Sequence, residues 1–136
     1  MKLVEGEAPM FEKLGLTRMA QALAAHSGSR LEVVARNVAN ADTPGYRSLD
    51  VQAFQAVYDG DRGMKLRTTR AGHLTNEYSY NGALVPAGSG MAPNGNDVSL
   101  DQQMMKAVEA RQGHEMALAV YRNTSAMIRT SLGRSN

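Results

Sequence analysis

The sequence predicts a mainly α-helical chain in which long N- and C-terminal helices pair, in a coiled-coil-like way, around an irregular glycine-rich middle. Three observations predict this fold. Apolar residues near both ends recur at alternating spacings of four and three, which places them on one helix face. Seven of the 13 glycines fall within residues 60–97. Aromatic residues make up only 5% of the chain, whereas there are nine methionines, whose flexible side chains suit helix packing.

The 136 residues are 43% hydrophobic, which is enough for one modest core. We expect five segments along the chain. They are an N-terminal extension (1–9), an N-terminal helix (10–41), a corner with a short segment (42–59), an irregular loop region (60–97) and a C-terminal helix (98–133).

Charge and composition argue against several classes of protein. The net charge is only +2, and the basic residues are scattered instead of gathered on one face, so no nucleic-acid partner is expected. The chain has no cysteine, which excludes disulfides and thiolate metal sites. Residues 1–7 lack the apolar run of a secretory signal, and no stretch approaches a membrane span of about 20 apolar residues.

The first helix is expected to carry a narrow stripe of mostly small residues: Ala20, Ala24, Ser27, Leu31, Val34 and Val38. Small side chains let a second helix approach closely. Gly28 weakens the helix locally, so we expect a bend near it. Pro44 cannot donate a backbone hydrogen bond and disfavours helical geometry at Thr43, which predicts that the helix ends near 39–41.

A structural corner is predicted directly after this helix, from six residues: Asn37, Asn40, Thr43, Pro44, Gly45 and Tyr46. The polar side chains among them would bond backbone groups left free at the helix end. The segment 43–46 fits a type II turn, with glycine where φ is positive. Tyr46 would fold back on the helix. An amide-lined ligand site is the alternative, but no pocket is apparent nearby.

The middle of the chain gives weaker signals. Residues 47–59 fit either a strand or a helix turn, and periodicity does not decide between them. Further on, 78–80 and 83–85 are expected to form short strands of a β-hairpin around Asn81-Gly82. The stretch 86–96 reads as loop.

The last helix has the strongest signals. Ser99 and Gln102 fit a capping box, and Gly133 a helix stop. A helix of this length, about 50 Å, is too long for a small monomer to bury, so both helices should pack on each other and on other subunits. The residues expected in this packing and assembly are Leu31, Val34, Val38, Leu100, Met104, Leu118, Tyr121, Ile128 and Leu132.

We find no constellation that would carry chemistry. His26, His73 and His114 have no metal-ligand spacing, and no nucleophile elbow or phosphate-binding loop is present. The sequence therefore predicts no catalytic, cofactor-binding or metal-binding residues and no small-molecule substrate. The protein is not expected to be an enzyme.

The corner motif, N-V-A-N-A-D-T-P-G-Y at 37–46, resembles the N-terminal signature of the bacterial flagellar axial proteins, the rod and hook family. The stretches 68–74 and 94–101 are similar to the proximal rod type of that family. The resemblance implies a structural subunit of the flagellar basal-body rod that assembles helically, transmits torque and encloses the export channel.

The same resemblance implies a location and partners. The rod spans the periplasm, and its subunits are exported without a cleaved signal peptide. Other rod subunits would be partners, as would the MS-ring adaptor or export gate at the rod base. The alternative reading is a soluble helical adaptor or chaperone that binds one partner through its amphipathic helices.

Overall fold

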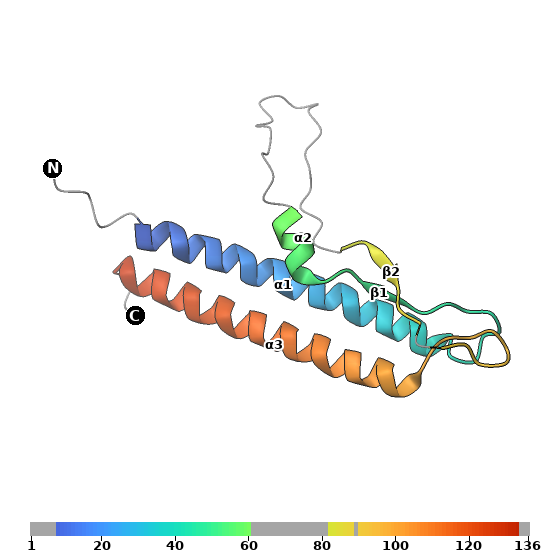
Figure 1. Cartoon of the computed structure of the whole chain (residues 1–136). Helices are drawn as coiled ribbons and strands as arrows, with labels where there is room; N and C mark the ends of the chain where they lie inside the picture. The colour runs from blue at the N-terminus through green and yellow to red at the C-terminus, as the bar shows by residue number, and fades with distance from the viewer. Residues whose placement is uncertain (1–7, 61–81, 89, 134–136) are drawn as a thin grey trace, which may run out of the picture.

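Two long antiparallel helices make up most of the molecule (Figure 1). The computed structural model describes residues 8–60, 82–88 and 90–133. Helices α1 (Ala8–Ala39) and α3 (Leu100–Ser131) have 32 residues each and lie side by side. The predicted fold class is confirmed. In the described part, neither of these helices has a stretch apolar enough to cross a membrane.

The seam between α1 and α3 follows a seven-residue repeat on both helices. The buried residues that follow this repeat are Ala20, Ser27 and Val34 on α1, and Gln103, Ala110, Ala117 and Thr124 on α3. Most are small, so the two backbones come close. A Cβ atom added to Gly113 would lie 3.1 Å from the Ser27 hydroxyl oxygen. This repeat is the pattern of coiled-coil packing.

On α3 the seam lies one residue earlier than the predicted 4-3 stripe. The predicted residues follow each seam position by one or four places, so they form a flank beside it. Leu118 and Ile128 there are half-buried, whereas Met104 is 66% exposed. The seam prefers Ala and Thr because only short side chains fit between such close backbones, and larger residues are displaced to the side.

A small sheet and a short helix lie on one side of the helix pair. Strand β1 (Leu49–Val51) pairs antiparallel with β2 (Leu84–Pro86), and α2 (Phe54–Gly60) packs on α1 (Figure 1). Residues 47–59 thus contain both a strand and a helix. The strand expected at 83–85 is found, but it pairs with β1. Its expected partner, 78–80, lies outside the described residues.

The ends of α3 differ in how well they match the predicted caps. Gly133 has φ 71° and follows the helix, as a stop requires. Ser99 occupies the N-cap position, but its side chain makes no capping hydrogen bond, so the predicted capping box is wrong. The segment before α3 is instead held by Asn96, whose Oδ1 accepts the Val98 N–H at 2.8 Å.

Helix α1 continues without a break through Gly28, where a bend was expected. A Cβ atom at this position would meet nothing within 4 Å. Gly28→Ala should therefore stabilise the fold by about 0.5–1 kcal/mol, because alanine loses less backbone entropy in a helix. Urea titration followed by circular dichroism measures this change. Gly113→Ala, which would press on Ser27, is the matched control and should gain less.

Candidate functional site at the helix-joining corner

The end of α1 turns into a tight corner that begins with local hydrogen bonds. Tyr46 N–H donates to the Thr43 carbonyl at 3.3 Å, and Gly45 has φ 72°. Both features are those of the predicted type II turn. Asn40 Nδ2 donates to the Arg36 carbonyl at 2.8 Å, and Thr43 Oγ1 donates to Asn40 Oδ1 at 3.3 Å. Asn40 therefore fastens the helix end, as expected from its sequence position.

Asn37 does something different from the helix-end bonding that its position suggested. It is fully buried and reaches sideways to two other elements. Its Nδ2 donates to the Leu49 carbonyl at 2.7 Å and to Gln103 Oε1 at 3.0 Å. Its Oδ1 accepts the Leu49 N–H and the Tyr46 hydroxyl, both at 3.2 Å. All four bonding positions of the amide are used, so Asn37 ties α1 to both β1 and α3.

The corner is closed from the other side by the loop before α3. Asn96, only 3% exposed, points its Nδ2 at three carbonyl oxygens, those of Asn40, Ala41 and Thr43, at 2.8–2.9 Å. These carbonyls belong to the turn that follows α1, which ends at Ala39, so Asn96 holds the corner itself. The sequence alone does not predict this role, although Asn96 lies in the stretch 94–101 that resembles the proximal rod type.

Asp97 adds a charge to the same closure. Its carboxylate accepts the Ser48 N–H and lies 3.6 Å from the Arg47 guanidinium, and its own N–H donates to the Tyr46 carbonyl at 3.3 Å. The bond from the Ser48 N–H is the main cause of a lowered pKa for Asp97, and the Arg47 charge adds to it. The corner thus joins segments about 50 residues apart in the chain.

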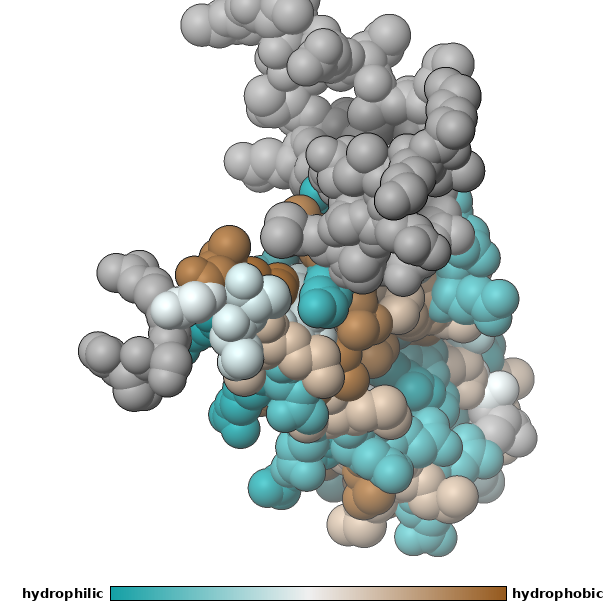
Figure 2. Space-filling model, turned by 90° about the vertical axis from the view of Figure 1, so that its left-hand side faces the viewer, coloured by the Kyte–Doolittle hydropathy of each residue, from teal (hydrophilic) through white to brown (hydrophobic). Residues whose placement is uncertain are grey.

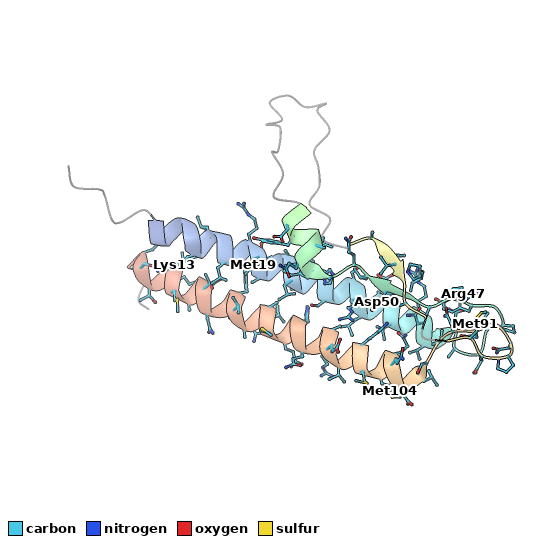
Figure 3. The ribbon with its side chains drawn as sticks, in the orientation of Figure 1. Lys13, Met19, Arg47, Asp50, Met91 and Met104 are labelled. Carbon is cyan, nitrogen blue, oxygen red and sulfur yellow. The ribbon has the colours of Figure 1, made fainter. Side chains whose placement is uncertain are left out.

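A second cluster ties the elements together one turn further along. Asp50 of β1 lies 3.0 Å from Arg30 Nε of α1 and 3.1 Å from Lys106 Nζ of α3, and Arg30 also reaches Glu109 at 3.4 Å. Figure 3 labels Asp50 on the side of the helix pair that carries the sheet. Burial raises the pKa of Asp50, but hydrogen bonds from Arg30, the Val51 N–H and Lys106 outweigh it, and the pKa is lowered.

These two aspartates give the fold an acid-sensitive component. Because their pKa values in the folded chain lie below the ordinary value, their stabilisation is complete above about pH 5 and disappears as the pH falls below about 4. We expect the urea midpoint to drop over this window. Asp50→Asn should make the drop in the urea midpoint smaller. Asp42→Asn, at an exposed position, is the control for the loss of one carboxylate. An unchanged pH profile for Asp50→Asn would contradict the assignment.

The two described histidines each contact a backbone carbonyl of another segment. His26 Nε2 lies 2.7 Å from the Gln52 carbonyl oxygen, and His114 Nδ1 lies 3.2 Å from that of Ala24. His73 lies outside the described residues. Within the described ranges, no three His, Cys, Asp or Glu side chains gather as a metal site would require.

The residues predicted for packing and assembly divide into two groups. Val34 is buried in the seam, and three others are half-buried: Leu31, Leu118 and Ile128. The remaining five are exposed: Val38, Leu100, Met104, Tyr121 and Leu132. The structure therefore brings together the corner residues, while it leaves most of the assembly set on the surface.

Comparisons with known proteins match the corner and the helices. The family model for flagella basal body rod proteins matches residues 15–47, which cover most of α1 and the corner. The flagellar basal body rod protein FlgB of Agrobacterium fabrum is 31% identical over 111 residues, covering 77% of this chain and 83% of that protein. FlgB of Buchnera aphidicola is 26% identical over 101 residues, covering 69% and 76%.

Proposed function

The chain belongs to the family of flagellar basal body rod proteins that includes FlgB, and on this premise we propose that it builds the proximal part of the rod. It is a structural subunit of the basal-body rod. We further propose that copies of it assemble helically around the export channel, within a rod that spans the periplasm. Its neighbours would be other rod subunits and, at the base, the MS-ring adaptor or export gate.

The observation that carries this proposal is the combination of a self-contained corner with an exposed apolar surface. The polar groups of Asn37 and Asn96 are bonded to the chain's own backbone and side chains and hold the corner together. The helices still expose large apolar side chains such as Met104, Met116 and Leu132. Figure 2 displays hydrophobic side chains among hydrophilic ones at one end of the molecule. Such a surface is typical of a subunit.

The ties between the helices suit a part that carries torque. Sliding α3 along α1 would break the Asn37–Gln103 bond and separate Lys106 from Asp50. It would also move large residues into the space that the small seam residues leave, and close-packed interiors resist such shifts. We propose that load is passed between α1, β1 and α3 through these contacts.

Purified hook–basal bodies provide the test. We expect the chain to remain in them, at a constant ratio to other rod proteins, after washes that remove loosely bound factors. A chaperone or adaptor would be present in the cell but absent from these particles. Absence of the chain from purified rods that are otherwise complete would contradict the proposal.

A further inference from the structure

The seam divides α3 into two flanks with different surroundings. Residues one before or three after a seam position, such as Glu109 and Gly113, face the side that carries β1 and α2. We call this the cleft flank. Residues one or four after a seam position, such as Leu118 and Tyr121, lie on the opposite side. We call this the open flank, and it carries the 4-3 stripe predicted from the sequence.

The open flank presents an aromatic side chain, and the residue that follows it in the chain is a cation. Among the described aromatic side chains only Tyr121 is exposed by more than a third, at 38%. The neighbouring Arg122 is also exposed and has no ion-pair partner within the described residues. Tyrosine and arginine are the residue types that most often dominate the binding energy of protein interfaces.

The cleft flank offers a hollow of about 430 Å³ between α1, α3 and the chain that follows β1. Its apolar lining includes Leu23, Ala53, Phe54, Ala110 and Gly113. Ala110 and Gly113 place no large side chain on the α3 side of the hollow. Polar side chains such as His26 and Ser27 line the hollow as well, which suits tyrosine, because its ring is apolar and its hydroxyl can hydrogen-bond to polar groups.

The charges of the hollow favour an uncharged ring with a cation beside it. Two cations, Arg30 and Lys106, are matched by two anions, Asp50 and Glu109, so the interior of the cluster is already neutral. Glu109 is nevertheless 60% exposed at the rim. An incoming cation could pair with the Glu109 carboxylate. An incoming anion would find both cations of the cluster already matched.

We propose that Tyr121 of one copy of this chain inserts into the cleft flank of a second copy, with Arg122 placed near Glu109 of that copy. This inference rests on the proposed function as a polymerising rod subunit. The ring and the hollow lie on opposite flanks of the same helix pair, so each copy offers both halves of the contact. Such a contact is heterologous, and it leaves a free half at each end, as growth of a helical rod requires.

The contact also predicts how neighbouring copies are arranged. Gly113 and Tyr121 are eight residues apart, which is about 12 Å along α3. Copies joined in this way would stand side by side with only a small shift along the helix direction. A symmetric contact between two open flanks would instead close a dimer and stop growth.

Mixed cysteine cross-linking tests the proposal, since the chain has no cysteine of its own. Cells would express two differently tagged copies, one with Ser125→Cys, one turn beyond Tyr121, and the other with Ala53→Cys in the cleft. After mild oxidation of purified basal bodies, we expect a disulfide-linked pair that carries both tags. In the control, the second copy carries Glu32→Cys, on the far side of α1, instead of Ala53→Cys, and no such pair should form.

A second substitution tests the ring itself. In the Ser125→Cys copy, Tyr121→Ala should reduce the yield of the mixed pair by about 30-fold, while Tyr121→Phe should retain most of it. Thermal melts of both variants verify that the monomers still fold. Two results would overturn the docking. One is cross-linking only between the Ser125→Cys sites of two copies. The other is the absence of any mixed pair in basal bodies that contain both copies. If neither copy is present in basal bodies, the proposed function itself fails.

Discussion

Asn37→Ala is expected to lower the free energy of unfolding by about 3–4 kcal/mol, which is a large fraction of the stability of a domain this size. The substitution removes four hydrogen bonds at once. It leaves a buried group of Gln103 and partly buried groups of Leu49 and Tyr46 without these partners, and such groups cost more than the lost bonds themselves. Chemical denaturation measures the effect, and loss of swimming in soft agar should accompany it.

The nearby Asn40 provides the matched control, because it is the second asparagine of the same motif. Its amide bonds only the Arg36 carbonyl and the Thr43 hydroxyl, and both bonds are exposed. Asn40→Ala should therefore cost about 1 kcal/mol or less. Equal losses for the two variants would contradict the assignment of Asn37 as the tie between α1, β1 and α3.

Gly45→Val should cost about 2–3 kcal/mol and prevent incorporation into the rod while leaving expression intact. Gly45 has φ 72°, a conformation that β-branched residues rarely adopt. A shift of this backbone would also disturb the bond from the Gly45 N–H to the Asn94 carbonyl, which closes the corner against the loop before α3. Detection of the variant in purified basal bodies measures incorporation.

The expected cost of Gly45→Val does not come from steric crowding. A Cβ atom at Gly45 meets nothing within 4 Å, so the cost comes from the backbone conformation. Gly45→Asn, which tolerates positive φ, should be incorporated nearly as well as the wild type, with Gly45→Ala between the two. If valine is incorporated as readily as asparagine, the positive-φ turn is not required for assembly.

The sequence predicts most of what depends on local patterns. The two long helices follow from apolar periodicity, and the corner turn follows from Pro44 and Gly45, since these residues restrict or free their own backbone angles. The exposed flank of α3 was visible as a 4-3 stripe. What the stripe did not reveal is that small residues one position earlier, such as Ala110 and Ala117, form the seam.

Features that depend on distant partners were not predictable in this way. A strand was expected at 83–85 and is found at Leu84–Pro86, but its pairing with β1 depends on how the chain returns across about 30 residues. Asn96 was part of a recognisable motif, yet its bonds to carbonyls about 55 residues earlier exist only once α1 and α3 are paired. The sidewise bonds of Asn37 have the same origin, because they need Leu49 and Gln103 in place.

Removal of the gene, with electron microscopy of the remaining basal bodies, tests the claim of a rod subunit most directly. We predict that cells without this chain keep the membrane ring but have neither rod nor hook, and that the wild-type gene restores both. The Asn37→Ala copy should restore them poorly. Complete rods and hooks in the deletion strain would contradict the claim that this chain builds the rod.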